Sequence, residues 1–152
     1  MTDPPPQVWT VGHGARPLAD LLAVLASARI TLVVDVRRFP GSRRHPQYGR
    51  TALTEGLGAA GVGYEWWGEA LGGRRSRSPD SRHVALRQAA FAGYADHMDT
   101  DVFRGAATDL LARAGEQRLA VDRSQSHRLH QAVRQDRDGW PVYDGSEGLP
   151  GL

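Results

Sequence analysis

Apolar residues recur along the first part of the chain in the order typical of alternating strands and helices. Residues 7–12 alternate apolar and polar side chains and predict a first strand. Four leucines between Leu18 and Leu25 follow the i, i+3, i+4, i+7 spacing of a helix that packs on a sheet, with Pro17 suited to its first turn. Residues 30–36 are apolar on both faces, as in a central parallel strand. These segments predict a β-α-β unit.

The rest of the chain continues this alternation. Thr51 is expected to cap the next helix and Gly61 to end it. Further helices are expected over residues 52–60, 84–98, 102–114 and 126–135. Further strands are expected over residues 62–67, 118–121 and 140–143, the last of them at an edge of the sheet. The predicted fold class is therefore α/β, a three-layer, Rossmann-like domain with a mainly parallel central sheet of about five strands and helices on both faces. One domain is expected over residues 7–144, with flexible tails at 1–6 and 145–152.

Composition narrows the chemistry available to such a domain. The 152-residue chain has no cysteine, which excludes disulfides, thiolate metal sites and a cysteine nucleophile. The six histidines are scattered along the chain rather than clustered, so we expect no metal site and no cofactor. No apolar run reaches the roughly 18 residues of a membrane span, and residues 1–7 do not resemble a signal peptide. The expected location is the cytoplasm.

Positive charge is concentrated in one third of the chain. All 19 basic residues are arginine, which a high-GC coding bias would explain by itself. Residues 37–87, however, contain ten arginines and four acidic residues, a local excess of six positive charges. Such an excess in a near-neutral chain favours a polyanionic partner. We expect nucleic acid, DNA in preference to RNA, or a nucleotide, and no membrane partner; the sequence leaves the oligomeric state open.

The second predicted strand ends in a carboxylate, Asp35, and runs into an arginine-rich loop. Ligands of open α/β sheets bind outside the carboxyl ends of the strands. Asp35 is therefore a candidate catalytic group that could orient a water or stabilise a cationic transition state; the alternatives are an ion-pair partner of Arg37 or a helix cap. The loop contains two aromatic residues that are expected to be exposed, Phe39 and Tyr48. It is either a solvated loop or a phosphate-binding site that Phe39-Pro40 makes more rigid. Its candidate binding residues are Arg37, Arg38, Arg43, Arg44 and Tyr48.

Three further segments are expected at the same edge of the sheet: His13, residues 69–74 and residues 122–128. His13, between two glycines at the end of the first strand, is a candidate catalytic residue rather than a core residue. Glu69 is the second candidate catalytic carboxylate. Residues 68–79 are expected to form an irregular mobile lid, or else a disordered surface loop. The turn within this segment is a hinge or a set of binding residues, Gly72, Gly73 and Arg74. Of Trp66 and Trp67, one is expected in the core and the other as a base-stacking platform.

Five motifs in order resemble the bacterial and archaeal family catalogued as domain of unknown function 488. They are Val11-Gly12-His13, Val34-Asp35-Val36-Arg37 with Phe39-Pro40-x-Ser42-Arg43-Arg44 and Pro46-x-Tyr48, Leu71-Gly72-Gly73-Arg74, Gly93-Tyr94-Ala95-Asp96-x-Met98, and His127-Arg128. The resemblance covers residues 8–143, and its last motif adds His127 and Arg128 to the candidate binding residues. Family members commonly have Cys-Ala-Glu and Cys-His-Arg where this chain has Val121-Asp122-Arg123 and Ser126-His127-Arg128. Unless those cysteines are essential, the chemistry falls to His, Asp, Arg and Glu residues.

These features support two hypotheses of different classes. The first is a nucleic-acid binding enzyme acting on a base or sugar-phosphate centre, such as a DNA-repair glycosylase or another hydrolase, without a covalent cysteine intermediate. The second is a binding module for nucleic acid or a phosphometabolite, without catalysis. Ser126 and His127 could suggest a nucleophile and its base, but adjacent residues at a helix start do not face each other, so Ser126 is expected to be a helix cap.

Overall fold

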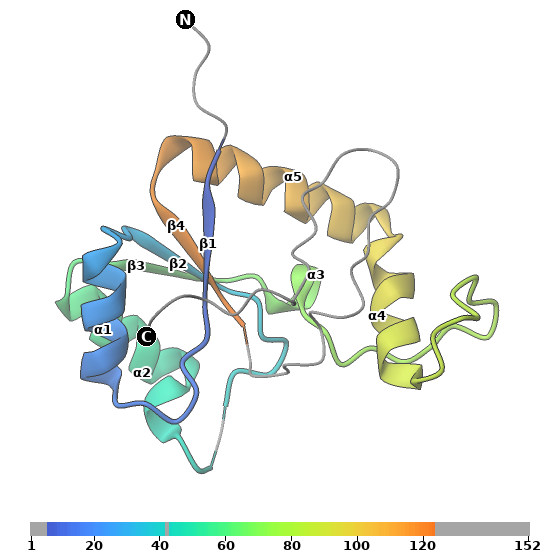
Figure 1. The fold of residues 1–152 in the computed structure, drawn as a ribbon, viewed down its shortest axis with the longest axis horizontal. Coiled ribbons are helices and arrows are strands. Elements are labelled where there is room, and N and C mark those ends of the chain that lie inside the picture. The colour runs from blue at the N-terminus through green and yellow to red at the C-terminus, as the bar shows by residue number, and fades with distance from the viewer. Residues whose placement is uncertain (1–5, 42, 124–152) are drawn as a thin grey trace, which may run out of the picture.

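The computed structural model describes residues 6–41 and 43–123, which form a parallel sheet with helices packed on it (Figure 1). The strands are β1 (Val8–Val11), β2 (Leu32–Asp35), β3 (Gly63–Trp66) and β4 (Leu119–Asp122). Their order in the sheet is β1-β4-β2-β3, and all three pairings are parallel. The helix expected over 126–135, the strand expected over 140–143 and the C-terminal tail lie outside the described residues.

Helices cover both faces of this sheet, which confirms the three-layer α/β class. On one face, α1 (Leu18–Ser27) and α2 (Arg50–Ala59) pack leucines into a core that includes Val33 of β2. On the other face, Leu110 of α5 (Asp101–Glu116) packs against a second core that includes Val34. Successive side chains of a strand point to opposite faces, so a continuous apolar strand is what a sheet covered on both sides requires.

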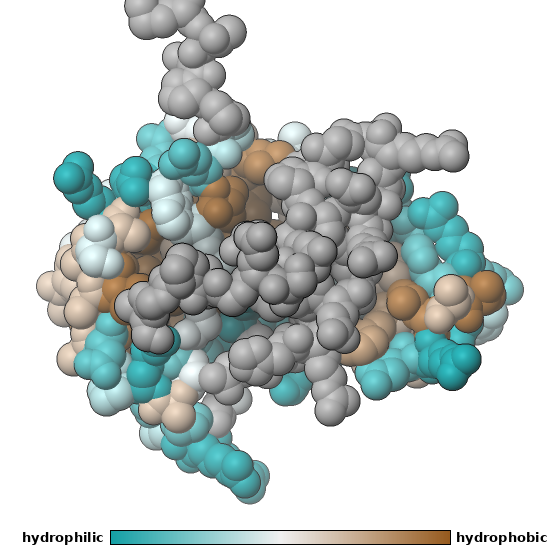
Figure 2. Space-filling view, viewed as in Figure 1, coloured by the Kyte–Doolittle hydropathy of each residue, from teal (hydrophilic) through white to brown (hydrophobic). Residues whose placement is uncertain are grey.

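Three further elements lie outside the sheet and the helices that cover it. They are the 3-10 turn η1 (Pro46–Tyr48), α3 (Gly68–Leu71) and α4 (Ala89–Met98). A segment without helix or strand, residues 72–88, joins α3 to α4 and lies with α4 at the right of the view (Figure 1). The tip of the loop before η1, at the lower edge of the same view, is hydrophilic (Figure 2). None of the helices in the described residues is long and apolar enough to cross a membrane.

Three local expectations are wrong. The N-cap of α2 is Gly49 rather than Thr51, and no side chain caps this helix. The helix expected from residue 84 begins at Ala89, and Val84 is 76% exposed, so its apolar side chain does not mark a buried helix face. The first residues of the expected irregular lid form α3. α3 can form here because Gly68 packs against the backbone of the loop that follows β2. A Cβ atom at residue 68 would collide with the carbonyl oxygen of Arg37 in that loop.

Candidate functional site

Two buried aspartates lie side by side at the carboxyl edge of the sheet. Asp35 ends β2 and Asp122 ends β4, and the two are register partners on adjacent strands. They are 0% and 1% exposed. Partners in a parallel ladder point to the same face, so both carboxylates enter one buried cluster. Sequence reasoning placed residues 122–128 at this edge but did not select Asp122 as a candidate, although an apolar strand ending in an acid was the signal that identified Asp35.

The carboxylate of Asp35 is fully engaged by neighbouring donors. Its Oδ1 accepts hydrogen bonds from the Arg37 backbone N–H (3.0 Å) and Nε (2.8 Å). Its Oδ2 accepts from Arg37 Nη2 (2.6 Å) and from the Tyr64 hydroxyl (2.7 Å). Burial and the hydrogen bond to Asp35 both raise the pKa of Tyr64, so this phenol remains a donor at neutral pH. The oxygens of Asp35 therefore face protein groups.

Arg37 is a buried cation at the centre of this cluster. It is 8% exposed, and its Nη2 also donates to the Tyr48 carbonyl oxygen at 2.9 Å. Burial by itself would lower the pKa of Arg37, but the hydrogen bond to Asp35 and the charges of Asp122 and Asp35 together raise it above its ordinary value. The guanidinium thus carries a permanent charge inside the protein, in contact with carboxylates rather than with solvent.

His13 contacts the second carboxylate of the cluster. Its Nδ1 lies 3.1 Å from Asp122 Oδ1, and its ring stacks on Tyr48 with the ring centroids 4.0 Å apart. The two side chains of the pair are 11% and 2% exposed. Within the described residues, no other hydrogen bond reaches the His13 ring. If Nδ1 carries the proton donated to Asp122, the Nε2 lone pair is left for an external group.

Asp122 joins His13 to the buried arginine. Its Oδ2 lies 3.5 Å from Arg37 Nε and accepts no hydrogen bond within the part of the chain that the structure describes. A buried carboxylate oxygen without a donor is costly in a folded protein and is often found where function requires it. His13, Asp122, Arg37 and Asp35 therefore form one continuous cluster of polar side chains at the edge of the sheet.

The next arginine turns away from this cluster and joins the loop after α3. Arg38 Nη1 donates to the Arg74 carbonyl oxygen at 3.0 Å, and Arg38 Nε lies 3.6 Å from Glu69 Oε2. Gly72 allows this approach, because a Cβ atom there would lie 2.8 Å from that of Arg38. Arg74 has a positive φ of 57°, an uncommon backbone conformation for a side chain of its size. Arg38, Glu69 and residues 72–74 are thus neighbours, as expected from their predicted positions.

The remaining candidate residues differ in accessibility. Arg43 and Arg44 are exposed in the loop before η1, and Gly73 is half-buried. Phe39 is 59% exposed as expected, but Tyr48 is 0% exposed, which corrects its apparent exposure. The Tyr48 ring lies under His13 and its hydroxyl donates to the Arg16 carbonyl oxygen at 2.5 Å. The last two candidate binding residues lie outside the described residues: His127 and Arg128.

The paired tryptophans at the end of β3 take different environments. Trp67 packs against the core below α5, and its indole N–H donates to Glu65 at 2.9 Å. Trp66 donates to the Arg37 carbonyl oxygen at 2.8 Å, and the Arg50 guanidinium lies 4.3 Å from its ring centroid. Trp67 thus packs against the core but is only partly buried, and base stacking on Trp66 stays a prediction. Within the described residues, no three metal-ligating side chains are grouped closely enough to hold a metal ion.

The fold and this cluster define an α/β protein with paired acidic and basic side chains at the carboxyl edge of a parallel sheet. The family model described as domain of unknown function DUF488 matches residues 17–133. The chain belongs to this family, as its motifs indicated. No curated protein and no solved structure matches the chain in the comparisons made with them.

Proposed function

We propose that this protein is a hydrolytic enzyme acting on nucleic acid, with His13 as its general base. The observation that carries the proposal is the His13–Asp122 contact of 3.1 Å at the carboxyl edge of the sheet. A carboxylate at Nδ1 holds the proton there and leaves Nε2 as the acceptor, an arrangement used for general-base catalysis. Nε2 would take a proton from water as the water oxygen attacks a sugar or phosphate centre, the bond to the base or to the leaving oxygen would break, and the leaving group would take a proton from solvent.

The neighbours of this pair have supporting roles in the proposal. Stacking on buried Tyr48 fixes the plane of the His13 ring. Arg37 balances the negative charge of Asp122 and Asp35. Because protein donors engage both oxygens of Asp35, we assign it a positioning role beside its original catalytic candidacy. A histidine held in one orientation loses less freedom on reaching the transition state.

The substrate class follows from charge and accessibility. Arg43, Arg44 and Arg74 are exposed around the same edge, within the part of the chain that has excess positive charge. Arginine forks suit phosphate oxygens, so we propose DNA, in preference to RNA, or a nucleotide as substrate. Glu69, with a side chain 68% exposed between Arg38 and Arg75, is the second candidate carboxylate, with an electrostatic role at a cationic transition state. A base-excision glycosylase and a phosphodiester hydrolase both fit this arrangement.

Turnover of a panel of damaged and modified oligonucleotides, with the product identified by mass, tests the proposal. His13→Ala and Asp122→Asn should each lower the rate by about two to four orders of magnitude, the usual cost of removing an acid-base group or its orienting partner. His83→Asn is a matched control, since His83 also contacts an aspartate, Asp99 at 2.7 Å, but in the loop before α4. Normal turnover in a folded His13→Ala variant would refute catalysis by this pair.

Binding measurements separate the enzyme from the non-catalytic module. Counterion release should make log affinity fall with log salt by about 0.9 per phosphate contact on duplex DNA. The module hypothesis predicts salt-dependent binding, no product from any oligonucleotide, and the same affinity in His13→Ala. Affinity that is absent, or equal at low and high salt, would contradict a nucleic-acid partner in either form.

A further inference from the structure

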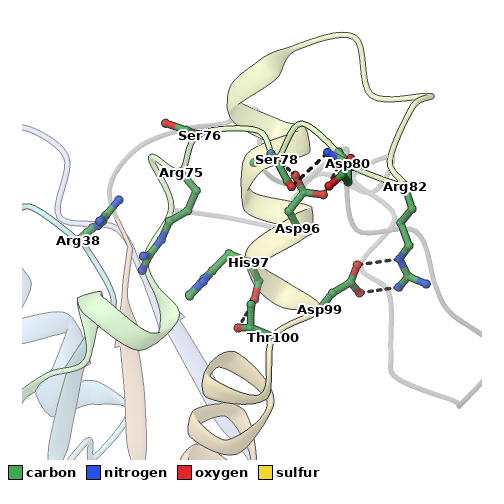
Figure 3. A pocket seen from close by; sticks show the side chains of 12 residues that line it. Arg38, Arg75, Ser76, Ser78, Asp80, Arg82, Asp96, His97, Asp99 and Thr100 are labelled. Atoms are coloured by element: carbon green, nitrogen blue, oxygen red, sulfur yellow. Dashed lines mark hydrogen bonds and ion pairs between the residues drawn. The ribbon is translucent and has the colours of Figure 1, made fainter.

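A cavity lies between the start of the arginine loop, the segment after α3, and α4. Its volume is about 670 Å³, within the roughly 300–1,000 Å³ typical of small-molecule sites. Arg38 and Arg75 stand on the sheet side of the cavity, and Asp96 and Asp99 stand on the α4 side (Figure 3). Arg38 follows Arg37 directly, so consecutive residues at the end of β2 serve the buried cluster and this cavity.

The α4 side of the cavity is held in shape by hydrogen bonds. Asp96 accepts from the Ser78 backbone N–H at 2.8 Å and from the Ser81 hydroxyl at 2.6 Å. Asp99 accepts from Arg82 Nε at 2.7 Å (Figure 3). These bonds fasten residues 78–82 onto α4. A cavity with such fixed walls loses little conformational freedom when a ligand binds.

Two polar groups in the lining have hydrogen-bonding capacity left. The Arg38 side chain is 27% exposed; its Nη1 donates to the Arg74 carbonyl oxygen, and its Nε is enclosed by protein without a hydrogen-bond partner within the described residues. The Asp80 carboxylate is exposed and accepts no hydrogen bond in the same part of the chain. The exposed part of the Arg38 guanidinium lines the cavity, where it can donate to the oxygens of an external anion. The cavity thus offers a cationic donor and an anionic acceptor.

We propose that this cavity binds a nucleoside monophosphate unit, with the phosphate at Arg38 and N–H groups of the base toward Asp80. The proposal rests on the proposed function, because it identifies the part of the nucleic-acid substrate held beside the catalytic edge. The planar guanidinium suits phosphate oxygens. A carboxylate accepts from exocyclic amino groups, as it does in base recognition. The opposite charges of the two sides favour such a dipolar ligand over a simple anion.

Isothermal titration calorimetry of the full chain with 2′-deoxycytidine 5′-monophosphate tests this inference, with deoxycytidine as the probe that lacks phosphate. Arg38→Ala should weaken binding of the monophosphate about 10- to 100-fold, the usual effect of removing a charged hydrogen-bond donor. Arg87→Ala should bind as the wild type does, since Arg87 is exposed and is not among the cavity-lining residues. Equal affinity for deoxycytidine and its monophosphate, or an unchanged affinity in Arg38→Ala, would overturn the inference.

Further variants separate this inference from the catalytic proposal. His13→Ala should bind the monophosphate normally while losing turnover, because His13 does not line the cavity. Turnover that depends on His13 but not on Arg38 would overturn the cavity assignment and leave the catalytic proposal standing.

If Arg38→Ala unfolds, Asp80→Asn provides the second test. This variant should bind the monophosphate several-fold more weakly and bind inorganic phosphate as the wild type does. Equal binding of the monophosphate by Asp80→Asn and the wild type would contradict the assigned orientation.

Discussion

Removing the Asp35 carboxylate is expected to destabilise the fold strongly. Breaking a buried ion pair by deleting one partner typically costs about 3–5 kcal/mol, because a buried charge remains. In Asp35→Ala, the Arg37 guanidinium stays buried, and the nearest remaining carboxylate oxygen is that of Asp122 at 3.5 Å. Asp122 replaces part of the lost attraction, so we expect a loss of about 3 kcal/mol. Since domains of this kind have free energies of unfolding of about 5–15 kcal/mol, the variant should fold but be marginal.

Urea unfolding followed by tryptophan fluorescence measures this loss, by linear extrapolation of the free energy of unfolding. Asp35→Leu combined with Arg37→Met should recover only part of the stability: it replaces both charges of the ion pair with apolar groups of similar size, but it leaves the buried carboxylate of Asp122 without its cation. Asp109→Ala, at an exposed position on α5, is the surface control and should change the free energy by less than about 0.5 kcal/mol.

One result would refute this reasoning about the buried cluster. If Asp35→Ala cost less than about 1 kcal/mol and the double variant were no more stable than the single one, burial of the ion pair would not govern stability at the end of β2. A stable Asp35→Ala variant without activity would then support the catalytic role of Asp35 over the positioning role.

Three further predictions concern packing and titration. Gly93→Ala should lower the free energy of unfolding by about 1–3 kcal/mol, because the added Cβ atom would collide with the backbone of the preceding loop. Gly105→Ala, where α5 faces open space, is the control and should leave the thermal stability unchanged or raise it. Tyr64→Phe should cost about 1–3 kcal/mol, because the hydrogen bond to the buried Asp35 carboxylate is lost. Since the pKa of Tyr64 is raised in the folded protein, the stability that its hydroxyl confers is complete below about pH 10 and is lost as pH rises through the folded-state pKa. Absorbance titration of the tyrosines would measure this loss. The hydrogen bond from Arg82 lowers the pKa of Asp99, so its contribution is present above about pH 4 and is lost as pH falls through the lowered pKa. Asp99→Asn should flatten that acid limb, and an unchanged acid limb would contradict this prediction.

Local pattern was sufficient for most of the fold. The strand over 30–36 and the leucine spacing of α1 depend on periodicity, which reports directly which faces are buried. The positive φ of Gly61 likewise agrees with its expected place at the end of α2. Helix starts were predicted less well. Thr51 has a capping side chain, but the hydrogen-bonding ladder of α2 begins before it, so residue type alone could not locate the boundary.

The composition of the candidate site depended on tertiary structure. The sequence by itself placed His13 and Asp35 at strand ends, and it could not say which residue each would contact. In the sheet, β4 lies between β1 and β2, so His13 meets Asp122, 109 residues away, while Asp35 turns to Arg37. Strand order is decided by which packing buries both apolar faces, a property of the whole chain. For the same reason, only the tertiary structure could show that Tyr48 is buried and that Arg38 lines a cavity.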